Sequence, residues 1–133
     1  MNVNRLRAAD PFTDLVAATF PSMREVTAFL GDAHCFAFAA EEGGAAVGFA
    51  YGHLLDRPDG RRAVLLYEVE VDPAHRRRGI ATALVASVLQ HGALSDAFEV
   101  WVLADPGNAA ARRLYETAAG SHAPQILYTW DLA

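Results

Sequence analysis

The stretch that decides the fold runs from Val71 to Leu84 and reads VDPAHRRRGIATAL. It joins a Val- and Leu-rich segment, residues 63–71, to a segment with apolar residues at helical spacing, residues 79–90. The first N–H groups of a helix have no partner inside the helix, and they carry the positive end of its dipole. Three consecutive arginines add charge and paired donors at this turn. The turn therefore predicts a binding site for a phosphate or pyrophosphate.

The turn is neither of the common nucleotide-binding loops. The sequence after it has no Gly-Lys-Ser/Thr, and the glycines of a dinucleotide-binding fingerprint are missing. An exposed basic turn with an ordinary glycine would also give an Arg-Gly pair. The strand before the turn, Pro73 and the long helix after it favour the anion site over that alternative.

Outward from this turn, the chain alternates between two periodicities of apolar residues. A spacing of two, as in Phe36 and Phe38, indicates strands, and turn signals such as EGG at residues 42–44 separate them. The predicted strands are residues 4–8, 34–41, 46–55, 63–71, 98–103 and 126–132, and the predicted helices are residues 10–20, 24–30, 79–90 and 108–118. This order predicts an α/β (α+β) fold in a single domain, residues 1–133, with a mixed, mostly antiparallel twisted sheet and helices on both faces.

Composition narrows the classes of partner. The chain has 16 acidic and 11 basic residues, a net charge of −5, and all its basic residues are arginines. An acidic protein is a poor general binder of nucleic acid, and it suits a cationic ligand. No apolar run is long enough for a membrane helix, and residues 1–9 lack the apolar centre of a secretion signal. With its single cysteine, Cys35, the sequence predicts a cytoplasmic protein without nucleic-acid or membrane partners.

The pattern Arg76-x-x-Gly79-x-Ala81 resembles the Q/R-x-x-G-x-G/A signature of the GCN5-related N-acetyltransferase (GNAT) superfamily, and the order of elements is similar over nearly the whole chain. In that superfamily the turn binds the coenzyme A (CoA) pyrophosphate through backbone N–H groups, and the preceding strand pairs with the pantetheine arm. The resemblance implies acetyl-CoA as co-substrate and no metal. The cofactor-binding residues that it implies are Val69, Val71, Arg76, Arg77, Arg78, Gly79, Ile80, Ala81, Thr82, Asn108 and Ala111.

A second motif, NAAARRLY at residues 108–115, resembles the superfamily's N-x-x-A-x-x-L-Y pattern. Asn108 suits a helix N-cap. The resemblance places Ala111 against CoA and Tyr115 near the thioester sulfur, where a neutral phenol, with an ordinary pKa of about 10, can give a proton to the departing thiolate. Spacing alone would explain Tyr115 equally as a half-buried core aromatic. The following AAGSH, residues 118–122, departs from the superfamily pattern of a bulky apolar residue, glycine and an aromatic.

Two carboxylates are the candidates for removing a proton from the acceptor. An amine is an ammonium ion at neutral pH and must lose a proton before it attacks. Glu68 and Glu70 lie two apart on a predicted strand, so both face the same side and together attract a cation. The alternative is a solvated strand face. The predicted catalytic residues are therefore Glu68, Glu70 and Tyr115, and the sequence leaves open which glutamate is the base.

A narrower resemblance concerns the acceptor. The segments FAFAA (36–40), AVG (46–48), LYEV (66–69) and HRRRGIATAL (75–84) resemble the type I aminoglycoside 3-N-acetyltransferases. Those enzymes have Tyr-Asp where this chain has Tyr67-Glu68, so the resemblance gives Glu68 the role of base or amine ligand. It implies direct acetyl transfer from acetyl-CoA to an amine of a cationic small molecule, an aminoglycoside antibiotic.

The acceptor half departs from those enzymes, because residues 15–30 form a shorter stretch than theirs. A polyamine, an amino acid or a protein N-terminus therefore remain alternative acceptors, and a non-catalytic acyl-CoA-binding module is the alternative from another class. Members of the superfamily are often dimers, and the resemblance makes the C-terminal strand the candidate interface of a homodimer.

The remaining reactive and aromatic residues are predicted to be structural. Cys35 has no His or Asp at a motif spacing, and the five histidines do not form a metal-binding spacing. His53 could face the acceptor, although a core or surface position is the simpler prediction. Trp101 and Trp130 are predicted to lie in the core.

Overall fold

A computed structural model describes all of residues 1–133. It contains one five-stranded sheet in the order β1-β2-β3-β4-β5. The strands are β1 (Asn2–Arg5), β2 (Cys35–Glu42), β3 (Ala45–Asp56), β4 (Arg62–Val71) and β5 (Glu99–Trp101); β5 runs parallel to β4, and the other pairs are antiparallel. The helices are α1 (Pro11–Thr19), α2 (Val26–Phe29), α3 (Ile80–Leu94) and α4 (Ala109–Thr117), with short 3-10 turns η1 (Pro21–Met23) and η2 (Pro73–His75). The predicted mixed sheet is confirmed.

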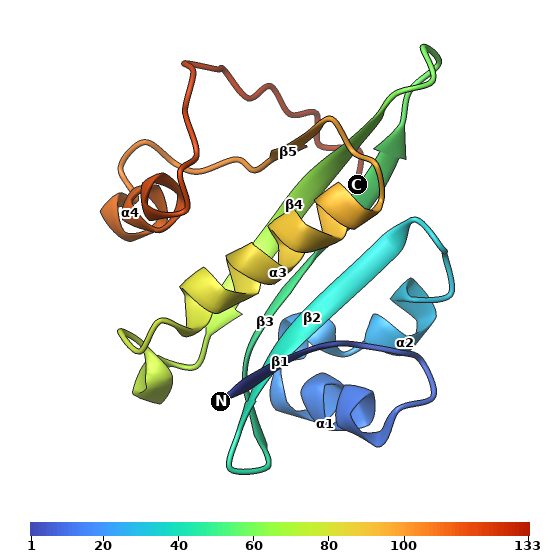
Figure 1. Ribbon diagram of the computed structural model, residues 1–133, viewed down its shortest axis with the longest axis vertical. Helices are drawn as coiled ribbons and strands as arrows, with labels where there is room; N and C mark the ends of the chain where they lie inside the picture. Colours follow the sequence, from blue (N-terminus) through green and yellow to red (C-terminus); the bar gives the residue numbers. More distant parts are fainter.

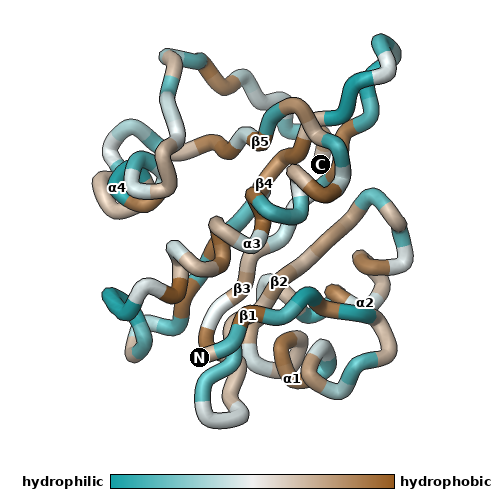
Figure 2. The backbone as a smooth tube through the Cα atoms, in the orientation of Figure 1, coloured by the Kyte–Doolittle hydropathy of each residue, from teal (hydrophilic) through white to brown (hydrophobic).

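Helices cover both faces of the sheet, as the sequence predicts. Figure 1 shows α3 running across one face, while α1 and α2 lie against the other face near β1 and β2. Each face has its own apolar core: one joins α3 to the sheet through side chains such as Leu66 and Leu84, and the other joins α1 and α2 to it through Val16 and Phe49. The hydropathy colours in Figure 2 follow this division, with apolar stretches along the central strands and α3. None of the helices combines the length and apolar composition that a membrane crossing requires.

A β-bulge in β4 decides which side chains face which core. Tyr51 pairs with Glu68, and Gly52 pairs with Leu66, so Tyr67 has no partner on β3. A bulge of this kind shifts the alternation of side chains by one residue. Leu66 before the bulge and Val69 after it therefore both pack on the α3 side. Glu68 and Glu70 are left facing the α1 and α2 side, and their predicted common face is confirmed.

Two glycines let α3 lie close to the sheet. A Cβ on Gly48 of β3 would stand 3.0 Å from the Glu70 carbonyl and 3.3 Å from both Ile80 and Leu84 of α3. A Cβ on Gly92 would stand 2.9 Å from Val100 of β5. The predicted end of this helix at residue 90 is wrong: α3 continues to Leu94, and Gly92 lies within it, where β5 approaches closely.

Both ends of the chain differ from the sequence prediction. The first strand is Asn2–Arg5 rather than residues 4–8, and α2 is shorter than residues 24–30 because η1 takes the start of that segment. The predicted strand 98–103 shrinks to three residues and is exposed rather than buried, since only β4 pairs with it.

The predicted strand 126–132 is wrong as well. This segment pairs with no strand, and an apolar pattern without a hydrogen-bonding partner does not make a strand. Trp101 and Trp130 are consequently 38% and 79% exposed, and the prediction that they lie in the core is wrong.

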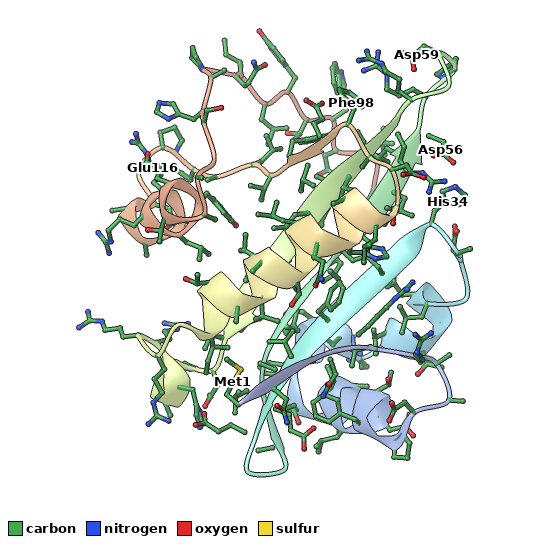
Figure 3. The ribbon with its side chains drawn as sticks, viewed as in Figure 1. Met1, His34, Asp56, Asp59, Phe98 and Glu116 are labelled. Atoms are coloured by element: carbon green, nitrogen blue, oxygen red, sulfur yellow. The ribbon has the colours of Figure 1, made fainter.

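A cluster of charged side chains links the strands at the end of the sheet opposite the turn that leads into α3. Asp56, at the end of β3, accepts hydrogen bonds from Arg62 Nε at 2.6 Å and Nη2 at 3.1 Å, and its Oδ2 lies 2.8 Å from His34 Nε2 (Figure 3). The hydrogen bonds from Arg62 and then His34 hold the pKa of Asp56 well below its usual range. This cluster ties the start of β2 to the β3–β4 hairpin and has no part in the candidate site described below.

His91 of α3 makes the stability of the fold sensitive to acid. Its ring packs against Phe36 at 4.8 Å and Phe38 at 5.8 Å, and its buried Nε2 has no hydrogen-bond partner. Burial, and secondly the charge of Arg5, lower the pKa of His91. The unfolded chain therefore takes up this proton more readily, so the free energy of unfolding falls as the pH drops below about 6.5 and levels off below the folded pKa.

The size of the loss at this residue is set by how far the folded pKa of His91 lies below its unfolded value. Urea unfolding at several pH values between neutrality and acid measures it. His91→Leu should flatten the acid dependence, whereas His122→Leu, at an exposed ring, should leave it unchanged. An identical acid slope in His91→Leu would show that other groups carry it.

Candidate active site

The sheet opens between β4 and β5. The two strands pair only through residues 63–65 of β4 and 99–101 of β5, and beyond Leu65 they separate (Figure 1). From Leu66 to Val71, β4 keeps β3 on one edge and has no strand on the other. This edge of β4, which no strand pairs with, leads to the start of α3.

The hydrogen bonds of β4 show which of its backbone groups face this open edge. The Asp72 N–H donates to the Val47 carbonyl at 2.8 Å, and the Glu70 carbonyl lies against Gly48, so both point toward β3. Successive residues of a strand present their backbone groups to opposite edges. Val69 and Val71 therefore present theirs to the open edge, where an extended ligand can pair with them as an added strand.

The first turn of α3 lies at the end of this edge. Gly79 begins the helix in the left-handed region, at φ 78°, and no side chain caps the first turn. The N–H groups of Ile80, Ala81 and Thr82, which the helix itself cannot satisfy, are therefore left for an outside acceptor. Arg77 is also left-handed, at φ 64°, although it is not a glycine. Backbone held in this region occurs at ligand-binding turns.

The three arginines of the turn differ in their contacts. The Arg76 Nε donates to the Val71 carbonyl at 3.2 Å and so ties the turn to the open edge of β4. Arg78 lies 3.6 Å from Glu42 and is exposed, and Arg77 is exposed. The resulting positive and donor-rich surface fits a pyrophosphate.

The side chain of Glu68 lies on the face of the sheet that α1 and α2 cover, where Tyr51 of β3 holds it. The Tyr51 hydroxyl donates to Glu68 Oε2 at 2.9 Å. Burial first, and then this hydrogen bond and the carboxylate charge, raise the pKa of Tyr51 to about 12, so the phenol keeps its proton. Glu70 lies on the same strand face opposite Phe49, without a hydrogen bond from a neighbouring side chain. Glu68 is therefore the more precisely oriented of the two carboxylates.

Aromatic rings surround the Tyr51–Glu68 pair. The ring of Tyr67, which the bulge sends to the same face, stacks on Tyr51 at 5.7 Å between centroids. The Phe29 ring meets Tyr51 edge-on at 5.5 Å and His53 at 5.4 Å. His53 thus lies on the same face of the sheet as Glu68. This environment can bind a cation between a carboxylate and ring faces.

Cys35 has a neighbour that sequence spacing did not reveal. Its Sγ lies 3.6 Å from His53 Nδ1 across the β2–β3 pair. Burial, followed by the charge of Asp32, raises the pKa of the Cys35 thiol. A nucleophilic cysteine needs the opposite shift, so the thiol is a structural group. No cluster of His, Cys, Asp and Glu side chains could hold a metal ion.

Helix α4 brings Tyr115 to the opposite face of the sheet from Glu68. Asn108 caps this helix, as predicted, by accepting from the Ala111 N–H at 3.0 Å. Tyr115, with Leu114 and Ala118, packs on the core of the α3 side, and burial raises its pKa. Tyr115 and Glu68 therefore lie on opposite faces of the sheet.

Sequence reasoning missed two features of this site, the Tyr51 hydroxyl and the bulge at Tyr67. Tyr51 is the partner of Glu68 only through the β3–β4 register, which no single segment encodes. A period-two alternation from Phe49 on β3 would have placed Tyr51 on the same face, but not its contact.

Comparisons with known proteins agree with this geometry. The model of the acetyltransferase (GNAT) family matches residues 4–120. The chain is 40% identical over 88 residues to the probable N-acetyltransferase family 8 member 5 of Mus musculus, covering 65% of this chain and 39% of the relative. It is 41% identical over 101 residues to the mycothiol acetyltransferase of Saccharomonospora viridis, covering 74% of this chain and 30% of the relative. The chain thus spans well under half the length of these curated relatives.

A solved structure is similar over its whole length. An aminoglycoside acetyltransferase from an uncultured soil metagenomic sample superposes with a TM-score of 0.83 at 25% identity, covering 99% of this chain and 98% of that one. The match of the family model to most of the chain, the open edge of β4 and the uncapped first turn of α3 lead to one conclusion. The chain belongs to the acetyltransferase (GNAT) family.

Proposed function

We propose that the protein is an acetyl-CoA-dependent N-acetyltransferase that acts on an amine of a cationic small molecule. One observation carries the proposal: β4 offers its open backbone edge toward the first turn of α3, and the same strand holds Glu68 on the acceptor face. A donor bound along the edge and an amine bound at the carboxylate would meet where β4 and β5 separate. Holding the two reactants together supplies most of the acceleration in such a transfer.

The proposed chemistry is direct transfer. Glu68 accepts a proton from the bound ammonium, with Glu70 assisting through water, and the free amine forms a C–N bond to the thioester carbonyl carbon. A backbone N–H of the Val69–Val71 edge polarises the carbonyl oxygen. As the C–S bond breaks, the nitrogen releases its remaining excess proton to water, Tyr115 gives its proton to the thiolate, and the tyrosinate recovers a proton from water. No step in this sequence needs a metal.

An aminoglycoside is the first candidate acceptor, with acetylation at its 3-amino group. The segments shared with the type I aminoglycoside 3-N-acetyltransferases support it, as does the similarity to the metagenomic aminoglycoside acetyltransferase. Relatives named for mycothiol and for L-2,4-diaminobutyric acid support amino-acid-like amines instead. Polyamines, protein N-termini and a non-catalytic acyl-CoA sensor are the remaining alternatives.

An assay of thiol release from acetyl-CoA tests the proposal, with gentamicin-type aminoglycosides, spermidine, free amino acids and short peptides as acceptors. Turnover with any of these amines supports N-acetyl transfer, and mass analysis of the product then locates the modified nitrogen. Tight CoA binding without thiol release from the whole panel would favour the sensor.

Tyr115→Phe separates the proposed proton donor from a packing residue. The substitution keeps the ring on the core and removes only the hydroxyl, so kcat should fall by roughly 100-fold while the melting temperature changes little. Leu114→Ala is the matched control, because it removes packing from the same turn of α4 and should lower stability more than kcat. An unchanged kcat in Tyr115→Phe would show that water, rather than Tyr115, protonates the thiolate.

The proposal includes a cytoplasmic homodimer. Cys35 has no partner for an internal disulfide, which suits a reducing compartment. Phe98 and Trp101 expose apolar surface along β5, whose outer edge is unpaired. Apolar surface of this kind is typical of a subunit contact. Sedimentation at micromolar concentration tests the dimer.

A further inference from the structure

We propose that a cavity beside Tyr51 is an acceptor subsite, and that it binds an apolar group of the amine that Glu68 receives. This inference rests on the proposed function. It adds the class of acceptor: a primary amine that carries, a few bonds from its nitrogen, an apolar group of about the size of a phenyl ring.

The cavity is small, open to solvent on one side, and lined mostly by apolar residues. It has a volume of about 170 Å³ and is lined by Ser22, Met23, Val26, Phe29 and Tyr51. Met23 and Val26 are buried in the core of the α1 and α2 side. Apolar cavities of about 150 Å³ in other proteins bind benzene. The volume therefore fits one six-membered ring or a branched alkyl group.

Tyr51 connects this cavity to the carboxylate. Its ring forms part of the cavity wall, and its hydroxyl donates to Glu68 Oε2 at 2.9 Å. A group in the cavity and a cation at Glu68 are thus separated by about one tyrosine ring. A single acceptor can reach both, provided that only a short chain joins its amine to its apolar group.

The surrounding rings decide which acceptors fit. Tyr67 stacks on Tyr51 and is 63% exposed, so it extends the aromatic wall toward the solvent. Ring faces beside a carboxylate stabilise an ammonium ion. Ser22 is the only polar side chain of the lining apart from the Tyr51 hydroxyl, and a hydroxyl placed in the cavity would lose its water without gaining enough hydrogen bonds. The subsite therefore favours an apolar group over a hydroxylated one.

Two simple amines test the subsite directly. Phenethylamine and ethylamine share the same aminoethyl group, and only phenethylamine can fill the cavity. We expect kcat/KM for phenethylamine to exceed that for ethylamine by roughly 10- to 100-fold, the effect of burying one aromatic group. Ser22→Phe, at the exposed rim, should reduce this preference to a few-fold. Thr27→Phe is the matched control on α2 outside the lining, and it should keep the preference.

The outcomes separate this inference from the proposed function. Equal kcat/KM for the two amines, or a preference that survives Ser22→Phe, would overturn the subsite while acetyl transfer stands. If no amine is acetylated, the proposed function fails, and calorimetric titration still decides the subsite. The subsite is supported if phenethylamine binds more tightly than ethylamine and this difference is lost in Ser22→Phe but kept in Thr27→Phe. Equal binding of the two amines overturns the subsite.

Discussion

Replacing Glu68 by glutamine is expected to lower kcat by roughly 100- to 10,000-fold, the usual contribution of a general base. The amide keeps the size of the side chain and an oxygen that can accept the Tyr51 hydroxyl, which now lies 2.9 Å from Oε2. It cannot take a proton from the ammonium. Binding of CoA and the melting temperature should therefore stay close to those of the native protein.

Raising the pH should partly restore turnover in Glu68→Gln. The acceptor amine then loses its proton in solution, and the rate should grow about tenfold per pH unit until the pH nears the amine's own pKa, about 10.4 for an alkylamine of the lysine type. Stopped-flow or plate-reader assays of thiol release across this range measure the effect. A rate loss that no increase in pH recovers would mean that Glu68 binds the amine rather than deprotonating it.

Glu70→Gln is the matched control, because Glu70 shares the strand face and lacks the hydrogen bond from Tyr51. A smaller loss in Glu70→Gln identifies Glu68 as the base. Equal losses would indicate that the two carboxylates act as a pair through water.

The second large effect is expected at the start of α3, where Thr82→Glu should change stability and CoA affinity in opposite directions. A carboxylate in the first turn interacts favourably with the helix dipole, by about 0.3 to 1 kcal/mol. The same charge repels a pyrophosphate and competes for the N–H groups of Ile80, Ala81 and residue 82. Losing one or two charge-assisted hydrogen bonds should weaken CoA binding by roughly 10- to 100-fold.

Calorimetry for CoA and thermal melting measure the two effects. Ala86→Glu adds the same charge to an exposed position one turn later, and it should leave CoA affinity nearly unchanged. Affinity that falls equally in both variants would indicate a general charge effect. Unchanged affinity in Thr82→Glu would place the pyrophosphate away from this turn.

The elements that sequence alone predicted well are those whose own residues decide their structure. The alternation around Phe36 and Phe38, and the turn at residues 42–44, lie within one hairpin, and β2 and β3 appear within one residue of their predicted bounds. The Asn108 cap is equally local. The wrong predictions concern distant contacts. Gly92 suggests a helix end, yet it serves close packing against Val100, and the 126–132 segment has an apolar pattern but no strand beside it.

The residues of the candidate site also divide into those that local sequence predicts and those that depend on distant contacts. Residues 76–82 are contiguous, so the arginines and Gly79 alone predict a phosphate-binding turn, and the structure places these residues at the end of the open edge of β4. The shared face of Glu68 and Glu70 followed from their spacing. Tyr51 and the cavity beside it did not, because they depend on how β3 pairs with β4 and how α2 packs on the sheet.

The close approach of α3 to the sheet, at Gly48 of β3 and at Gly92 of the helix itself, has a consequence for the choice of donor. With no room for a side chain between helix and sheet, the first turn of α3 stands at a fixed distance from the point where β4 and β5 part. In the proposed function, this fixed distance determines where the thioester of a bound donor lies. Because the phosphate end of the donor is bound at the first turn of α3, the length of the pantetheine arm sets the position of the reacting carbonyl. That position is the same whatever acyl chain the donor carries. A donor with a shortened arm would present its thioester out of register with Glu68, and no strength of phosphate binding would correct it.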